Sequence, residues 1–450
     1  MQQTKICLVY PDTMALPEFF NAATNITSRS EKTLPPLGVL YIIGNSAQNI
    51  DFIDNRVKRY TDEKLYDILK NYDVVGFSGT IFEIKQARSL SRKLMGIGKT
   101  TLYGGPNATV NWGKYINDFN VIFRGAADLV FDKVLENLND LAKFGFAKHG
   151  LTYVNPEPFR VEQLDALKYP AREKIDINEY RRKESAYLGD IYPVDTICSS
   201  RGCPFDCYFC SSCVIWGRQY ICRSVDSVIG EISYMKRRYG TRGIYFREDN
   251  FTSNKARLLE FCKKIKDQNI SWMCESRADT LDQDTVRQMA GAGCRAIWFG
   301  IESTDDVILR KIGKNITMKQ IEKTLDICSR EGIKTGGGFM MGFPFDDKHS
   351  IEENYRKSQK MNLDVKFYNR VWAVPDSAMY REIIEDKLDE YSFENIVLPA
   401  TRYLRASEVN EIYYKLVVRK GLWKKKIKKI LGENIVKLIR KYLRPKSKRK

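Results

Sequence analysis

The sequence lacks any long hydrophobic run. No stretch approaches the roughly 20 consecutive apolar residues that a helix needs to cross a bilayer. The first residues, MQQTKICLVYPDT, also lack the apolar core of a secretory signal peptide. We therefore expect a cytoplasmic protein, in which clustered cysteines are metal ligands rather than disulfide partners.

An evenly spread positive charge is missing as well. The formal net charge is +18, but residues 419–450 hold fifteen Lys or Arg and one acid, a net charge of +14. Within 422–443, apolar residues recur every three to five positions, the pattern of an amphipathic basic helix. Three interpretations stay open: a helix packed on the preceding domain, a helix on an anionic membrane surface, and binding to RNA or another acidic partner, with nucleic acid the least favoured.

The length of 450 residues predicts two or three domains. In residues 1–145, short apolar runs alternate with helical patterns, as in a parallel sheet wrapped by helices. We expect strands at 5–10, 73–78, 101–103 and 121–123 and a helix at 81–95. Sheets of this kind bind ligands at the carboxyl ends of their strands, where glycine lets the backbone approach closely. The alternative interpretation is that the glycines only form tight turns from strand to helix. The predicted binding residues at those ends are Ser78, Thr80, Gly104, Gly105 and Gly125.

The rest of the chain predicts a second α/β unit. A connector with four prolines and many charges occupies residues 146–195. Residues 196–400 then contain six strand patterns, each followed by polar residues, which predicts a full or partial β/α barrel with its site on the carboxyl face. A basic helical extension is expected in residues 401–450.

The most informative motif is the cysteine cluster CSSRGCPFDCYFCSSC at residues 198–213. Cys203, Cys207 and Cys210 have C-x3-C-x2-C spacing, and Cys213 adds a further C-x2-C step. Zinc or an electron-transfer cluster would use all four thiols, whereas a 4Fe-4S cluster with one open iron would use only the first three. The remaining cysteines are expected to be packing residues.

The three-cysteine spacing, with Phe209 before the last cysteine, resembles the radical SAM superfamily. The resemblance implies a partial TIM barrel, (β/α)6, and a 4Fe-4S cluster held by Cys203, Cys207 and Cys210. It places the binding of S-adenosylmethionine on strand-end residues, with an acidic pair near its amino group and a Gly-Ile-Glu-Ser segment near its ribose and carboxylate. The matching residues are Glu248, Asp249, Arg277, Glu302 and Ser303.

The first domain resembles the Rossmann-like cobalamin-binding domain found before many radical SAM domains. The segments that carry this resemblance are PPLGVLY at 35–41, VVGFSGT at 74–80 and GGPNAT at 104–109. Two departures are Asn107, where the family often has His, and Ala126, where it has a Gly-Glu-Gly or similar run. Only two histidines are present and no Asp-x-His-x-x-Gly motif occurs, so a bound cobalamin is expected to have no imidazole ligand from the protein.

Together the resemblances imply a cobalamin-dependent methyltransferase that acts on an unactivated carbon through a 5′-deoxyadenosyl radical. They also imply an external one-electron reductant of the flavodoxin or ferredoxin type and a small-molecule or lipid-linked substrate. A radical cyclisation or rearrangement without methyl transfer is the enzymatic alternative. A metal-binding protein with a basic membrane or RNA anchor is the non-enzymatic one.

Overall fold

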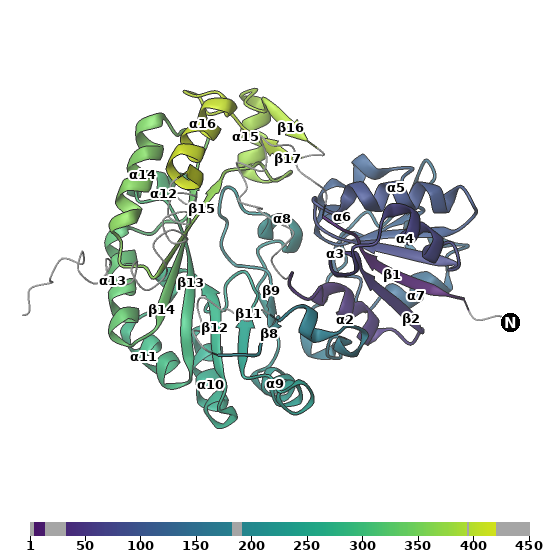
Figure 1. Cartoon of the computed structure of the whole chain (residues 1–450), viewed down its shortest axis with the longest axis horizontal. Helices are drawn as coiled ribbons and strands as arrows, with labels where there is room; N and C mark the ends of the chain where they lie inside the picture. Colours follow the sequence, from purple (N-terminus) through teal and green to yellow (C-terminus); the bar gives the residue numbers. More distant parts are fainter. Residues whose placement is uncertain (1–3, 14–32, 182–190, 394–395, 420–450) are drawn as a thin grey trace, which may run out of the picture.

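The computed structural model describes residues 4–13, 33–181, 191–393 and 396–419, which form two α/β units side by side (Figure 1). The α/β class and the two units expected from the sequence are both observed.

A seven-stranded sheet organises the first unit, with strand order β2-β1-β3-β4-β5-β7-β6. All neighbours are parallel except β6 and β7, which form an antiparallel hairpin. The strands are β1 (Ile6–Tyr10), β2 (Ile50–Asp54), β3 (Val74–Ser78), β4 (Thr100–Gly104), β5 (Val121–Ile122), β6 (Ala147–His149) and β7 (Thr152–Val154). The sheet therefore continues to Val154, past the predicted boundary at 145, because the hairpin adds its last two strands.

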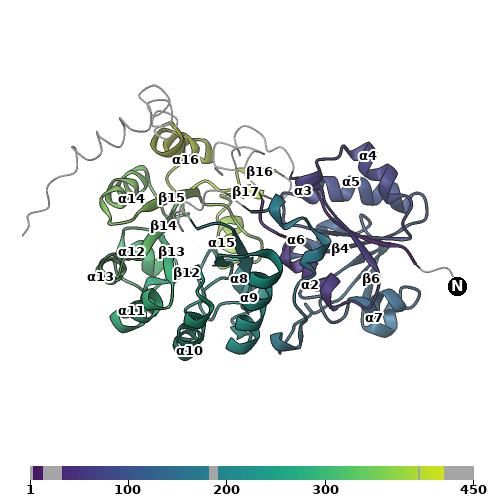
Figure 2. The ribbon, with the colours of Figure 1, turned by 60° about the horizontal axis from the view of Figure 1, so that its bottom comes forward.

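Helices cover both faces of this sheet (Figure 2). Alternate strand residues explain why: Leu8 packs into one core with Val39 of α2, and Val9 packs into the other with Leu90 of α5. The helices are α2 (Leu37–Asn45), α3 (Asn55–Lys58), α4 (Asp62–Leu69), α5 (Ile84–Met95), α6 (Pro106–Asn111) and α7 (Phe131–Glu136).

The connector is fastened to the second unit by buried charges. Arg172 donates to Glu231 of α9 (Val225–Tyr239) at 2.6 Å and to the carbonyl of Thr196 at 2.8 Å. Arg223 pairs with the other oxygen of the same carboxylate. Because all three side chains are buried, the network fixes where the connector crosses the barrel.

Six parallel strands form the second unit, in the order β15-β14-β13-β12-β11-β8. β8 and β15 are its two edges, so the barrel is partial and open, and Figure 1 shows helices along its outer side. The strands are β8 (Val194–Ile197), β11 (Gly243–Phe246), β12 (Ser271–Ser276), β13 (Cys294–Glu302), β14 (Lys334–Met341) and β15 (Val365–Arg370). The helices are α9 (Val225–Tyr239), α10 (Lys255–Ile265), α11 (Gln283–Gly291), α12 (Asp306–Lys311), α13 (Met318–Arg330) and α14 (Lys348–Lys360).

Short elements complete the second unit. They are β9 (Ser200–Arg201), α8 (Ser212–Trp216), β10 (Ile221–Cys222), α15 (Ala378–Glu385), β16 (Tyr391–Phe393), β17 (Ile396–Leu398), α16 (Ala406–Tyr413) and a π-helix (Tyr414–Arg419). Tyr413 donates to the carbonyl of Tyr368 at 2.7 Å, so α16 packs on the edge strand. The basic helix predicted within 422–443 lies outside the described residues, which end at 419.

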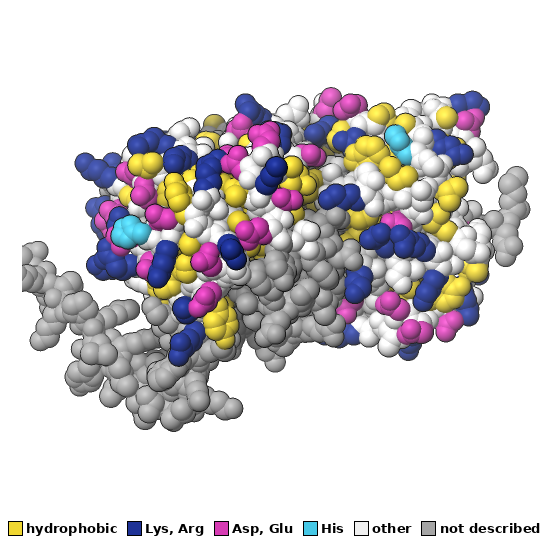
Figure 3. Space-filling model, turned by 90° about the horizontal axis from the view of Figure 1, so that it is seen from above, with side chains coloured by type: hydrophobic (Ala, Val, Ile, Leu, Met, Phe, Trp, Pro, Cys, Tyr) yellow, Lys and Arg dark blue, Asp and Glu magenta, His cyan; other side chains and the backbone are white. Residues whose placement is uncertain are grey.

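Acidic and basic side chains intermingle over the described part of the face seen in Figure 3. This agrees with the placement of most of the net charge in residues 419–450. None of the helices in the described ranges is both long and apolar enough to span a membrane.

Candidate functional site: a cysteine loop and an interdomain cavity

The cysteine loop lies between β9 and α8, beyond the carboxyl end of β8. The thiols of Cys203, Cys207 and Cys210 are partly exposed and form no disulfide. The amide of Cys210 donates to the carbonyl of Cys207 at 3.0 Å, which folds the C-x2-C step into a tight turn. The loop therefore presents three thiols at one end of the barrel.

Two carboxylates at the end of β11 hold this loop. Glu248 accepts a hydrogen bond from the amide of Ser199 at 2.6 Å and another from the hydroxyl of Ser200. Asp249 accepts from the hydroxyl of Ser212 at 2.7 Å. Burial raises the pKa of both carboxyl groups. The pair thus supports the loop from both sides.

Arg277, after β12, contacts the same loop. Its guanidinium lies 3.5 Å from the sulfur of Cys207 and 3.9 Å from the centre of the Phe205 ring. It also forms an ion pair with Asp279 at 2.8 Å. Burial raises the pKa of the Cys207 thiol, and the charges of Lys314 and Arg277 act in the opposite direction. A fixed cation beside a sulfur favours the thiolate, which is the form that binds metal.

Glu302 ends β13 in an unusual backbone conformation. Its φ is +70°, which is costly for a residue with a side chain, and the strand register shifts between Gly300 and Glu302. Its carboxylate lies 3.3 Å from the ammonium of Lys314. The hydroxyl of the neighbouring Ser303 accepts from the amide of Asp305 at 3.1 Å. The bulge therefore redirects the strand at the position predicted to contact S-adenosylmethionine.

The other cysteine and aromatic candidates have local roles. Phe209 packs with its ring centre 5.8 Å from that of Phe343. Cys213 donates to the carbonyl of Cys210 at 3.0 Å. Burial raises the pKa of Cys210 to about 12, so a metal bound there would displace a proton. Within the described ranges, no three His, Cys, Asp or Glu side chains converge on a point that could hold a single metal ion.

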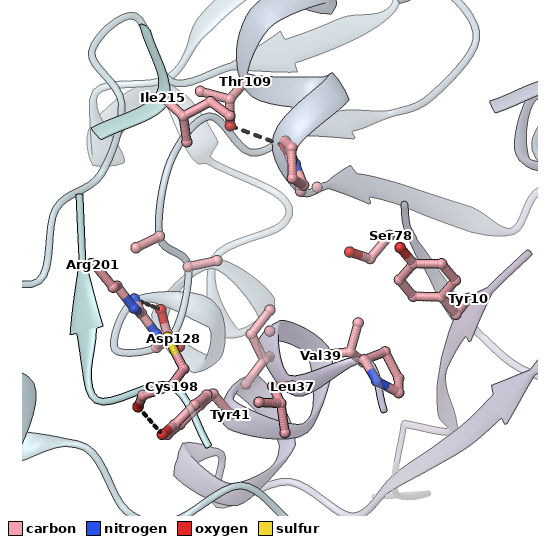
Figure 4. A pocket seen from close by; sticks show the side chains of 18 of the residues that line it. Tyr10, Leu37, Val39, Tyr41, Ser78, Thr109, Asp128, Cys198, Arg201 and Ile215 are labelled. Atoms are coloured by element: carbon pink, nitrogen blue, oxygen red, sulfur yellow. Dashed lines mark hydrogen bonds and ion pairs between the residues drawn. The ribbon is translucent and has the colours of Figure 1, made fainter. Parts of the chain in front are cut away.

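A cavity of about 750 Å³ lies between the two units (Figure 4), and residues that flank the loop, such as Arg201 and Trp216, line it. The three thiols of the C-x3-C-x2-C motif are not among its lining residues. From the first unit, four of the five predicted binding residues line it, namely Ser78, Gly104, Gly105 and Gly125. That they bind a cofactor remains a prediction. Thr80, also predicted, is not among the lining residues. Its amide and hydroxyl both donate to Glu83, at 2.7 and 2.6 Å, in the turn before α5.

Two of these glycines are required by their surroundings. Gly105 has φ +100°, and a Cβ there would lie 3.0 Å from the Ser78 hydroxyl. Gly125 has φ +82°, and a Cβ would lie 2.3 Å from the carbonyl of Phe159. Gly125 therefore serves the close approach of the connector as well as the cavity wall.

An ion pair in the lining of the cavity connects the two units. Arg201 of β9 donates to both carboxylate oxygens of Asp128, at 2.8 and 2.9 Å (Figure 4). Its guanidinium also lies 5.6 Å from the centre of the Tyr41 ring and 5.5 Å from that of the Trp216 ring. The Tyr41 hydroxyl also donates to the carbonyl of Cys198 at 3.4 Å. The cysteine loop is thus fastened to the first unit.

A sequence profile of the radical SAM superfamily matches residues 197–357, which include the cysteine loop and most of the barrel strands. The chain carries a radical SAM domain. It is a radical SAM enzyme, and this domain implies a 4Fe-4S cluster and S-adenosylmethionine as cofactors, with a reductant and a small-molecule substrate.

Relatives extend this likeness over the whole chain. The uncharacterized methyltransferase PH0819 of Pyrococcus horikoshii is 25% identical over 468 residues, covering 99% of this chain and 94% of that protein. An anaerobic magnesium-protoporphyrin IX monomethyl ester cyclase of Synechocystis is 27% identical over 82% of this chain and 78% of its own. The solved radical S-adenosylmethionine methyltransferase TsrM from Kitasatospora setae shares the fold, with a TM-score of 0.67 at 14% identity, covering 92% of this chain and 85% of its own.

Three residues of the site were not predicted from the sequence: Lys314, Arg201 and Asp128. Lys314 stands out because lysine is seldom buried, but its burial is visible only in the folded structure. Arg201 and Asp128 are 73 positions apart, so their pairing has no local sequence signature. The roles predicted for Glu248, Asp249, Arg277, Glu302, Ser303 and Phe209 toward S-adenosylmethionine remain predictions.

Proposed function

We propose that this radical SAM enzyme is a cobalamin-dependent methyltransferase that transfers a methyl group to an unactivated carbon of its substrate. The observation that carries the proposal is the interdomain cavity. Its walls come both from the strand ends of the Rossmann-like sheet and from the residues around the cysteine loop. A cofactor on the first domain and one on the barrel would therefore border the same cavity.

The residues of the cavity suit a corrin. Gly38 and Gly104 both line it; a Cβ on Gly38 would meet nothing within 4 Å, and one on Gly104 would meet only the Phe123 Cβ at 3.8 Å. The lining combines apolar residues such as Leu37 and Phe131 with the hydroxyl-bearing residues Ser78 and Thr109. A broad, largely apolar ring system with amide side chains needs this combination of open wall and scattered polar groups.

No imidazole reaches the cavity. His149 lies in β6, with its ring centre 5.1 Å from that of Trp112, and His349 lies in α14 on the barrel. Neither lines the cavity, and the chain has no other histidine. This supports the expectation that a corrin bound here would have no histidine ligand from the protein.

When bound, the cluster with S-adenosylmethionine supplies a carbon radical and cobalamin supplies a transferable methyl group. The chain's own residues would hold these two cofactors in fixed positions relative to each other. Cys203, Cys207 and Cys210 would bind the cluster, and Glu302 would orient S-adenosylmethionine. The Arg201–Asp128 pair would keep the two cofactor sites at a fixed separation.

The test is an anaerobic incubation of the reconstituted enzyme with a reductant, methyl-deuterated S-adenosylmethionine and a small-molecule extract of the source cells. We expect a product heavier by one deuterated methyl group, found by mass spectrometry, together with 5′-deoxyadenosine. The variant Cys207→Ala is the control and should give neither. Deuterium-free products beside 5′-deoxyadenosine would contradict methyl transfer.

That second result would favour radical cyclisation or rearrangement, which the cyclase relative supports as the alternative. Iron and cobalt counts on protein purified without oxygen from cobalamin-supplied cells test the cofactors separately. Iron near four per chain with no cobalt would also count against the cobalamin proposal. Zinc without iron would contradict the cluster itself.

We further infer that residues 419–450 hold the enzyme at an anionic membrane surface, which makes a lipid-linked substrate plausible. The support is the concentration of fifteen Lys or Arg in this segment, interleaved with Trp and aliphatic residues. A chain ending at Val418 is expected to lose binding to vesicles that contain anionic lipid. Equal sedimentation of the full and shortened chains with those vesicles would remove this inference.

A further inference from the structure

Lys314 is a buried lysine for which the functions argued above have no use. Its side chain is 7% exposed, in the loop between α12 and α13. Its ammonium donates to the carbonyl of Gly300 at 2.5 Å and lies 3.3 Å from the carboxylate of Glu302. Burying an ammonium is costly unless it is paired, so this placement needs a reason beyond filling space.

The backbone around Lys314 contacts the cysteine loop. The Lys314 carbonyl accepts from Arg277 at 2.6 Å, the same guanidinium that lies 3.5 Å from the sulfur of Cys207. The amide of Tyr208 donates to the carbonyl of Ile312 at 3.1 Å. A Cβ on Gly313, whose φ is +73°, would lie 2.8 Å from the carbonyl of Asp206. The loop that carries Lys314 is therefore packed directly on the residues around Cys207.

We propose that Lys314 is a positioning residue that joins the two halves of the radical SAM site. It clamps the bulge at the end of β13, so that the Glu302 carboxylate is held where S-adenosylmethionine binds, and it places a second positive charge beside Arg277 near Cys207. The strained φ of +70° at Glu302 explains the need for a clamp, since a bulge of this kind persists only where its surroundings fix it.

The inference rests on the radical SAM domain alone and is independent of cobalamin and of methyl transfer. Two consequences follow. Loss of the ammonium should weaken binding of S-adenosylmethionine, because Glu302 loses its only ion-pair partner in the described part of the chain. It should also make the cluster harder to reduce, because the added electron loses a nearby fixed positive charge.

The experiment compares Lys314→Met with Lys311→Met, both as cluster-loaded enzyme. Lys311 is exposed, lies over the Phe345 ring at 4.9 Å and forms no ion pair in the described residues, so its variant removes the same charge three positions away. For Lys314→Met we expect about tenfold weaker binding of S-adenosylmethionine by equilibrium dialysis. We also expect a more negative midpoint potential and a smaller change in the cluster's electron paramagnetic resonance spectrum on adding S-adenosylmethionine. Lys311→Met should match the parent enzyme.

Two further variants test the proposal even if the Lys314→Met protein does not fold. Lys314→Arg should restore the potential, because it keeps the charge. Glu302→Gln should weaken binding of S-adenosylmethionine to a similar degree, and adding Lys314→Met to it should weaken binding little further. Unchanged affinity and spectrum in Glu302→Gln, or in a folded Lys314→Met, would overturn the proposal.

Discussion

Each cysteine of this chain has the same side chain, and its surroundings decide its role. Cys274, Cys294 and Cys328 are buried among the apolar residues of the barrel core. Each of these thiols is buried against core side chains, which is typical of a cysteine that only packs. Cys203, Cys207 and Cys210 instead lie on a loop and are partly exposed. Cys207 among them lies 3.5 Å from the guanidinium of Arg277.

The first prediction separates the three proposed ligands from their neighbour Cys213. Cys203→Ala, Cys207→Ala and Cys210→Ala should each lose most of the acid-labile sulfide and the absorbance of the cluster after anaerobic reconstitution. Cys213→Ala should retain both, because its thiol only donates to the Cys210 carbonyl at 3.0 Å. The control is Cys222→Ala in β10, also partly exposed. A Cys213→Ala protein without a cluster would indicate a closed site with four thiolates.

At the level of the elements, helix starts in the barrel depend on polar caps. Asp282 caps α11 by accepting from the amide of Thr285 at 2.9 Å and from its hydroxyl at 2.7 Å, and it pairs with Lys255 at 2.5 Å. These bonds, the one from Lys255 first, hold the pKa of Asp282 well below its usual value. A lowered folded-state pKa means that the charged form stabilises the fold.

The second prediction concerns the contribution of the Asp282 cap to stability. Asp282→Ala should lower the free energy of unfolding by about 1 kcal/mol near neutral pH. Asp282→Asn keeps a capping oxygen and should lose less. The stabilisation is present above the unfolded pKa of about 4 and is lost as the pH falls through the lower folded value. The difference between the parent and Asp282→Ala in urea unfolding should therefore shrink in acid, and a difference that grows below pH 4 would contradict the assignment.

Sequence patterns predicted the long elements well because local rules govern them. All six barrel strands follow short apolar runs, and α5 begins at Ile84, close to the predicted start at 81. The β6–β7 hairpin was missed because its two strands are three residues each. The bulge at Glu302 could not be foreseen either, since it depends on β14 beside it and on Lys314 across the loop. Contacts between segments far apart in the sequence determine such a bulge, and these contacts cannot be predicted from a single sequence.

At the scale of the whole molecule, two kinds of contact hold the domains around the cavity. On one side are the Arg201–Asp128 ion pair and the Tyr41 hydroxyl bond to Cys198. The second kind is an aromatic contact. The ring centre of Phe82, which follows β3, lies 5.2 Å from that of Trp372, which follows β15. The polar contacts carry direction as well as attraction, so they set the angle between the domains.

The third prediction concerns that ion pair. Both side chains are largely buried, at 12% and 5% exposed, so removing one partner leaves a buried charge unpaired, which typically costs about 3–5 kcal/mol. Asp128→Ala should therefore loosen the domain interface, which small-angle X-ray scattering would show as a larger radius of gyration. The exposed Lys70–Asp67 pair supplies the control, because Asp67→Ala should leave the interface unchanged. The same variant also tests the two proposed cofactor sites. Since the cysteine loop stays bound to the barrel through Glu248 and Asp249, the Asp128→Ala protein should keep the iron of the cluster while losing the cobalt of cobalamin. Equal loss of both metals would mean that the ion pair supports the loop itself and not the spacing of the two cofactor sites.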